Sequence, residues 1–165
     1  MASKKKTKAK ARTAPAAKRT TRTAKKSPRA GTQPKGLTLS SVAPSFTVSD
    51  LEKSIGWYRD VLGSVIKDRW VHEGQLMGVE MQAGGVTFML GQDDWKKGRD
   101  RAKGEGFRLY CETTQDVDRL ADQIKAKGGT LAQEPRDESW GARAFSVEDP
   151  DGFKITISKL QRRGR

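Results

Sequence analysis

The alternation of apolar and polar positions divides residues 37–160 into two similar halves. In the first half, alternation up to Val48 predicts a strand. A helix follows, with apolar residues at helical spacing: Leu51, Ile55, Tyr58 and Leu62. We expect Ser49 to cap this helix, with Glu52 completing a capping box, and Gly63 to end it. Three further strands are predicted at residues 64–71, 75–82 and 86–90.

The second half repeats this order. A strand is predicted at residues 107–112, followed by a helix that starts near Thr113 and Asp116 and ends at Gly128-Gly129. Further strands are predicted at residues 130–134, 141–147 and 153–158. The repeat indicates an α+β fold of two tandem βαβββ modules, about residues 37–92 and 105–160, with a charged connection at 91–105.

The stretch Trp140–Ile157 predicts a strand, a tight turn and a second strand. The turn is Asp149-Pro150-Asp151-Gly152. Proline fixes φ, aspartate bonds its own backbone and glycine accepts a positive φ. Turn chemistry therefore explains both carboxylates without a catalytic role.

Four short motifs occur together: Val48-Ser49-Asp50, Trp57-Tyr58, Leu62-Gly63 and Asp149–Gly152. This set resembles the vicinal oxygen chelate superfamily, which groups glyoxalase I, bleomycin-resistance proteins and extradiol dioxygenases. The resemblance covers residues 38–160 and implies a curled eight-stranded mixed sheet around a cleft. It also implies a homodimer, because clefts in this superfamily are commonly completed across a two-fold axis or by paired modules.

One face of each sheet should be apolar and pack on the helix, which leaves the other face for a ligand cleft. The helix side is expected to hold Phe46, Val48, Val86, Phe88, Leu90, Phe107, Leu109, Cys111, Phe153, Ile155 and Ile157. The other parity holds Ala43, Ser45, Thr47, Thr87, Met89, Arg108, Tyr110, Glu112, Lys154 and Thr156. The candidate ligand-binding residues are Ala43, Ser45, Met89, Arg108, Tyr110, Glu112, Trp140 and Thr156. The alternative is that this face only meets water.

Two side-chain types could select the ligand. Arg108 can pair with Glu112, four residues along the strand, whereas an unpaired guanidinium would favour a carboxylate or phosphate. Trp95 and Trp140 at the rim would favour a flat aromatic or a cation. Trp57 and Trp70 are expected in the core.

The resemblance implies that metal-dependent members have their ligands at the positions of Ala43, Met89, Arg108 and Thr156. None of these side chains is the imidazole or carboxylate that a divalent metal prefers. The lone His72 is expected to be a surface residue, so we predict no metal, no cofactor and no catalytic residue. This favours the metal-free branch that resembles bleomycin-resistance proteins. The single cysteine, Cys111, excludes an intramolecular disulfide, suits a reducing cytosol and is expected to be an inert core thiol.

Charge is distributed unevenly along the chain. Residues 1–36 carry 13 of the 33 Lys and Arg and none of the 20 Asp and Glu. With no large apolar residue between Met1 and Leu37, this segment is predicted to be disordered. We expect it to contact nucleic acid without sequence preference through Lys4, Lys5, Lys6, Lys8, Lys10, Arg12, Lys18, Arg19, Arg22, Lys25, Lys26 and Arg29. A second basic end lies at 161–165, and the alternative for the tail is a solubilising extension.

The sequence therefore predicts a metal-free protein that binds a small organic molecule, is cytoplasmic and associates with the nucleoid through its tail. No apolar run approaches the roughly 20 residues of a membrane span. Two alternatives stay open. One is a metal-dependent lyase, isomerase or dioxygenase of the same superfamily, and the other is a nucleoid-associated structural protein whose fold only dimerises.

Overall fold

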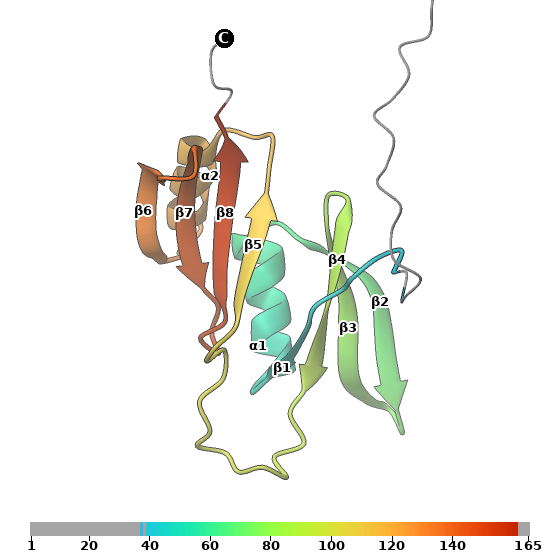
Figure 1. The fold of residues 1–165 in the computed structure, drawn as a ribbon. Coiled ribbons are helices and arrows are strands. Elements are labelled where there is room, and N and C mark those ends of the chain that lie inside the picture. Colours follow the sequence, from blue (N-terminus) through green and yellow to red (C-terminus); the bar gives the residue numbers. More distant parts are fainter. Residues whose placement is uncertain (1–36, 38, 162–165) are drawn as a thin grey trace, which may run out of the picture. The chain divides into compact units, whose positions relative to one another are not determined.

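The strands form two four-stranded sheets in the computed structural model, which describes residues 37 and 39–161 (Figure 1). The first sheet has the order β1-β4-β3-β2 and contains β1 (Ser45–Val48), β2 (Val65–His72), β3 (Gln75–Ala83) and β4 (Val86–Gln92). The second has the order β5-β8-β7-β6 and contains β5 (Arg108–Glu112), β6 (Leu131–Asp137), β7 (Ala142–Glu148) and β8 (Lys154–Leu160). The parallel pairs are β1–β4 in the first sheet and β5–β8 in the second, and all other strand pairs are antiparallel.

This arrangement confirms the α+β class and the two tandem βαβββ modules. The expected single sheet of eight strands is not formed, because β1 pairs only with β4 and β5 only with β8. The two modules meet instead through aromatic side chains: the Phe46 ring lies 5.9 Å from that of Phe107 and 4.8 Å from that of Phe153. The basic segments predicted at 1–36 and at the C-terminal end beyond residue 161 lie outside the described residues.

The helices are α1 (Leu51–Gly56), which continues as the π-helical turn η1 (Trp57–Val61), and α2 (Val117–Ala126). The N-cap of α1 lies one residue after the expected position, and the N-cap of α2 lies three residues after it. Asp50, not Ser49, caps α1, and Asp116, not Thr113, caps α2; each carboxylate accepts the amide three residues on at 3.0 Å. The Ser49 amide donates to Asp151 at 3.0 Å and not to Glu52, so the expected capping box is not formed. None of the helices in the described range is long and apolar enough to cross a membrane.

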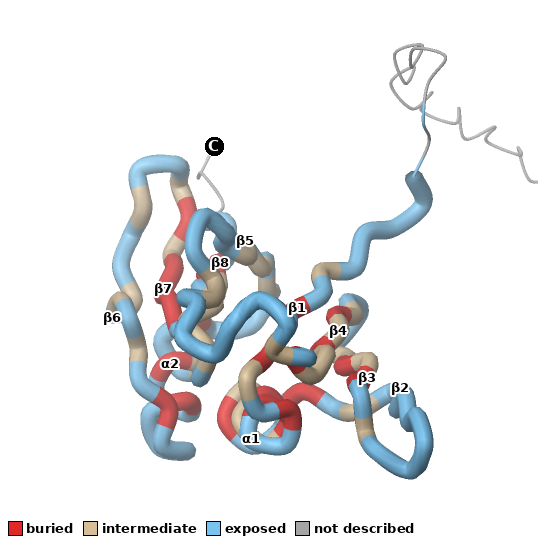
Figure 2. Tube along the Cα trace, turned by 90° about the horizontal axis from the view of Figure 1, so that it is seen from below, coloured by how far each residue is buried: buried red, intermediate tan, exposed pale blue. Residues whose placement is uncertain are grey.

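The two helix-covered faces share one core, and Figure 2 shows its buried residues on α1, on β7 of the second sheet and on β3 and β4 of the first. The predicted helix side is confirmed for Phe46, Val48, Phe88, Leu90 and Ile155, which are all buried. Val86 and Phe107 belong to the same parity but are 61% and 43% exposed: Val86 is the first residue of β4, and Phe107 comes just before β5. Alternation thus predicts the face correctly but not how far burial extends toward a strand end.

The acidic turn of the second module binds the helix of the first. Asp149 Oδ1 accepts the amides of Asp151 at 2.9 Å and Phe153 at 2.8 Å, as a local turn requires. Its Oδ2 accepts the hydroxyl of buried Tyr58 at 3.0 Å. Burial, and then the neighbouring Asp149, raises the pKa of the Tyr58 phenol, so this group keeps its proton and donates. Turn chemistry accounts for the first two bonds but not for the third, which joins the modules.

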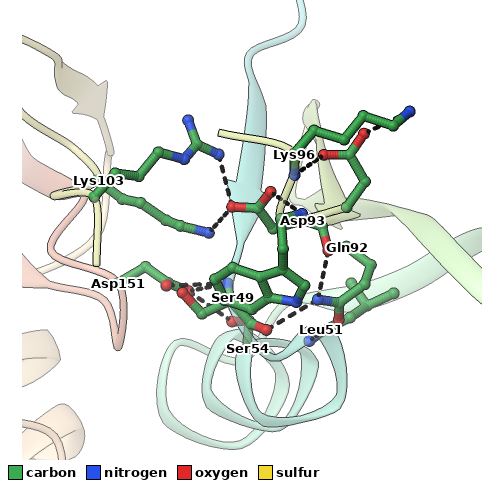
Figure 3. A network of polar contacts seen from close by, with 11 residues as sticks. Ser49, Leu51, Ser54, Gln92, Asp93, Lys96, Lys103 and Asp151 are labelled. Atoms are coloured by element: carbon green, nitrogen blue, oxygen red, sulfur yellow. Dashed lines mark hydrogen bonds and ion pairs between the residues drawn. The ribbon is translucent and has the colours of Figure 1, made fainter. Parts of the chain in front are cut away.

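The second carboxylate of the turn also reaches the first module. Both Asp151 oxygens accept the amide of Ser49, at 3.0 and 3.1 Å, and one lies 3.5 Å from the Ser54 hydroxyl (Figure 3). Gln92, at the end of β4, accepts the Leu51 amide at 3.0 Å and donates to the Ser49 carbonyl at 2.9 Å. The loop between β1 and α1 is therefore fixed both by its own sheet and by the other module.

Asp93 closes the connection between the modules. Its Oδ2 lies 2.6 Å from Lys103 Nζ and 2.6 Å from Arg101 Nη2, and its Oδ1 accepts the Trp95 amide at 3.0 Å (Figure 3). The side chains of Asp93 and Lys103 are only 2% and 5% exposed. Hydrogen bonds from Lys103 and then Arg101 hold the pKa of Asp93 far below its usual range. Because Asp93 follows β4 and Lys103 precedes β5, this ion pair positions the start of the second module.

The Asp93→Asn substitution should lower the free energy of unfolding at neutral pH, because it leaves the Lys103 ammonium buried without an anion. A carboxyl whose pKa is lowered by folding contributes stability above its unfolded pKa of about 3.9, and this stability is lost as the pH falls through the folded value. Denaturant unfolding should therefore show a gap between wild type and D93N that narrows below about pH 4.

Asp94→Asn is the matched control for this prediction. Asp94 is the neighbouring residue, its side chain is 53% exposed and it pairs with Lys96 at 3.2 Å. An exposed pair of this kind contributes little to stability, so D94N should unfold almost like the wild type. An equal loss in D93N and D94N would contradict the prediction.

Candidate functional site

The open face of the first sheet, which the helices do not cover, contains two of the predicted site residues in register. Ser45 on β1 and Met89 on β4 are Cα partners, and Glu80 on β3 continues the same row. Glu80 is paired with Lys67, whose Nζ lies 2.9 Å from Oε1. Ser45 and Ala43 are exposed and Met89 is half-buried. This row therefore presents one thioether, one hydroxyl and an already paired carboxylate.

Trp70 lies on this open face instead of in the core, which corrects the expectation from sequence. Its ring packs over Gly78, where a Cβ would lie 2.7 Å from ring atom Cε3, and the residue is 39% exposed. Val79 and Met81 point to the core, so the parity of β3 already placed Gly78 on the open face. The missing side chain at Gly78 makes room for the indole.

On the second sheet, a row of hydrogen bonds orients Arg108. Its Nη1 donates to Thr156 Oγ1 at 3.3 Å, and this hydroxyl lies 3.0 Å from Ser146 Oγ. Thr156 and Ser146 are buried, whereas Arg108 is exposed. The described residues include every Asp and Glu of the chain, and none of them, Glu112 included, forms an ion pair with Arg108. The guanidinium is therefore held at one end and unpaired.

Lys154 completes a pair of cations at this place. It is the Cα partner of Arg108 on the adjacent strand β8. Together the two residues border two hollows, of about 180 and 210 Å³. The first hollow is also lined by Gln133 and Glu148, and the second by Phe107. All lining residues come from the second module or from the glycines just before it.

Of the other predicted aromatic site residues, one lies beside this pair and two lie apart from it. Tyr110 is next to it, as the Cα partner of Thr156, and is 65% exposed. Trp140 lies in the turn before β7, whereas the residues of this seven-residue strand that line the first hollow, Ser146 to Glu148, are at its other end. Trp95 belongs to the connection, where its ring centroid is within 5 Å of two cationic side chains. Apart from the two tryptophans, the predicted residues thus form one group on each sheet. The candidate list from sequence lacked Ser146, Glu148 and also Lys154, although Lys154 was placed on the ligand face.

The positions that the resemblance assigns to metal ligands do not fit a divalent metal. Ala43 and Met89 belong to the first module, Arg108 and Thr156 to the second, and none has an imidazole or carboxylate. Within residues 37 and 39–161, no group of three or more His, Cys, Asp or Glu is placed to hold a metal ion. The side chain of His72 is 78% exposed at the end of β2.

Cys111 shows no sign of reactivity. It is partly buried against the core, and burial raises the pKa of its thiol. A raised pKa lowers the thiolate fraction, which is the reactive form. This agrees with the inert thiol expected from its apolar parity.

Comparison with known proteins gives consistent matches over this range. Residues 38–157 match the family model of the Glyoxalase/Bleomycin resistance protein/Dioxygenase superfamily. A probable lactoylglutathione lyase from Synechocystis is 30% identical over 117 residues, which cover 67% of this chain and 87% of that protein. A lactoylglutathione lyase from Arabidopsis thaliana is 28% identical over 127 residues, but the match covers 71% of this chain and only 42% of the relative.

Solved structures share the fold. The crystal structure of a glyoxalase/bleomycin resistance protein/dioxygenase from Nocardioides superimposes with a TM-score of 0.63 at 17% identity, covering 79% of this chain and 90% of that one. At this identity, the likeness concerns the fold alone.

Proposed function

The chain belongs to the glyoxalase/bleomycin resistance protein/dioxygenase superfamily, and we propose that it binds a small organic molecule, without a metal ion, on the open face of its second sheet. The observation that carries this proposal is the pair Arg108–Thr156. The resemblance assigns metal ligands to both positions, yet here they hydrogen-bond to each other at 3.3 Å. A guanidinium held by a buried hydroxyl binds and orients a ligand but does not coordinate a cation.

The groups around the hollows support binding more than chemistry. The hydroxyls of Ser146 and Thr156 are hydrogen-bonded to each other at 3.0 Å, and no carboxylate or imidazole of the described residues hydrogen-bonds to either of them. Glu148 is the one carboxylate that borders the described hollows, and its Oε1 lies 3.9 Å from Lys154 Nζ. A cationic, hydroxyl-lined surface is better suited to recognition.

The alternative is a metal-dependent lyase, isomerase or dioxygenase. It is favoured by relatives that are named lactoylglutathione lyase and opposed by the side chains at the assigned ligand positions. The purified full-length protein discriminates between the two. We predict no stoichiometric divalent metal by elemental analysis and a co-purifying small molecule by native mass spectrometry. One Zn, Ni, Fe or Mn per chain would favour the enzyme, and a protein with neither metal nor ligand would contradict the binding role.

We also propose that a second copy completes the cleft. The open faces lie opposite the shared core, and the described hollows touch no residue of the first sheet. A second copy could place its first sheet, with Met89 and Trp70, across from Arg108 and Tyr110. Residues 37–165 carry 20 Lys and Arg against 20 Asp and Glu, so net charge would not oppose self-association.

Sedimentation at high micromolar concentration should therefore detect a homodimer. Met89→Arg should shift it toward monomer by placing a charge on the open face of β4. Val86→Arg is the matched control, because Val86 lies on the same strand, is exposed and belongs to the opposite parity. A monomeric wild type, or equal dissociation by both variants, would contradict the proposed interface.

The basic tail is proposed to contact nucleic acid and so to associate a cytoplasmic protein with the nucleoid. The support is compositional: residues 1–36 carry 13 cationic side chains and no acid, whereas the rest of the chain has equal numbers of both signs. Neutralising phosphates releases condensed counterions, which favours binding to any duplex. In the remaining alternative, a structural nucleoid protein, the folded part would bind no ligand.

Full-length protein should bind duplex DNA without sequence preference. If about half of the tail cations engage phosphates, the log–log slope of affinity against salt should be about −5 or steeper. The protein without residues 1–36 should bind weakly at the same salt and should leave the chromosome in cells. Equal binding or equal chromosome retention by both forms would place the nucleic-acid contact on the folded part and overturn this assignment.

A further inference from the structure

We infer that the ligand of the second sheet is a small organic oxyanion, a carboxylate or phosphate ester attached to a ring-sized apolar group, held by Arg108 and Lys154. This rests on the proposed function, because it names the ligand class of the same face. Two cations on adjacent strands repel each other unless an anion lies between them. They are Cα partners here, and both border the same two hollows.

Neither cation is neutralised by a strong ion pair. None of the Asp and Glu side chains, all of which lie in the part of the chain that the structure describes, is within salt-bridge distance of Arg108. Lys154 has Glu148 at 3.9 Å, with both side chains 47% exposed, and a pair of this length and exposure contributes little. The pair of cations therefore keeps most of its positive potential for a ligand.

The guanidinium is oriented before any ligand arrives. Thr156, which is 4% exposed, accepts from Nη1, and Ser146, which is 5% exposed, fixes the threonine hydroxyl. Among the described residues only Thr156 accepts a hydrogen bond from Arg108, so the other N–H groups are available. A planar fork of donors matches the two oxygens of a carboxylate or phosphate.

The hollows indicate the size of the remainder of the ligand. Both hollows are open to solvent, and their volumes of about 180 and 210 Å³ leave room for a ring-sized group. Phe107, which is 43% exposed, is the apolar residue that lines the second hollow, although its ring also lies 5.9 Å from that of Phe46 in the core. A ring on Phe107 with its oxyanion on Arg108 fits this arrangement.

The test uses full-length protein and three probes: benzoate, phenyl phosphate and benzamide, which is the uncharged analogue of benzoate. Backbone amide shifts at residues 104–108 and 146–156 report binding at this face and exclude signals from the basic tail. We expect saturable shifts with benzoate and phenyl phosphate and no saturation with benzamide. Inorganic phosphate, added alone, measures how much of the affinity comes from charge without the ring.

Four variants test the charges. R108Q and K154Q should each weaken benzoate and phenyl phosphate binding by about tenfold or more, as expected for loss of a charge-assisted contact. E148Q should tighten binding, because it removes the competing carboxylate. K159Q is the matched control: Lys159 lies on β8 but on the opposite face from Lys154, and the net charge changes equally. It should leave the affinity unchanged.

The outcomes separate this inference from the proposed function. Equal binding of benzamide and benzoate, or equal weakening by K154Q and K159Q, would overturn the oxyanion inference while leaving a metal-free binding face. No shift with either anion would also overturn it. The proposed function itself would fail if stoichiometric metal were found or if no small molecule co-purified.

Discussion

The carboxylates of Asp149 and Asp151 belong to the second module, but the first module supplies donors that satisfy them. Tyr58 donates to Asp149 at 3.0 Å within the protein interior, and the Ser49 amide donates to Asp151. A buried polar group without a partner costs more than its hydrogen bond contributes. Separating the modules would expose the rings that pack against Phe46 and would break the hydrogen bond between Tyr58 and Asp149. Because both changes are unfavourable, the two βαβββ units behave as one folded body.

This junction determines which surfaces remain for a ligand. Because the helix-covered faces of both sheets contribute to the same core, the opposite faces are left at the surface. On the second sheet that face contains buried hydroxyls at its centre and exposed charges at its edge. The connection contributes to this geometry, since the pair Asp93–Lys103 and the close contact of Gly104 with Gly152 place the start of β5 against β8.

In the metal-free role that we propose, the positive charge of the cleft would have a different source from that of the metal-dependent members. A metal ion would bring positive charge to the cleft from outside the chain, whereas Arg108 supplies it from the sheet. An arginine is always charged and directs its donors in a plane, so it selects the shape of an anion without acting as a Lewis acid. Residues 37–165 carry equal numbers of basic and acidic side chains. Apart from the tail, the positive potential at this face therefore comes from the cations of the face itself and not from a net charge of the folded part.

The sequence alone determined the order of elements, the two repeats and the face of most strand residues, because period-2 and helical patterns are local properties of the chain. It also placed Arg108 and Thr156 on the same face. Only the tertiary structure decided that these two residues, 48 positions apart, share a hydrogen bond, and that Tyr58 reaches Asp149 across 91 positions. It likewise placed Trp70 over Gly78 outside the core and left the strands as two sheets. Pairing and register depend on contacts between distant segments, which no local pattern encodes.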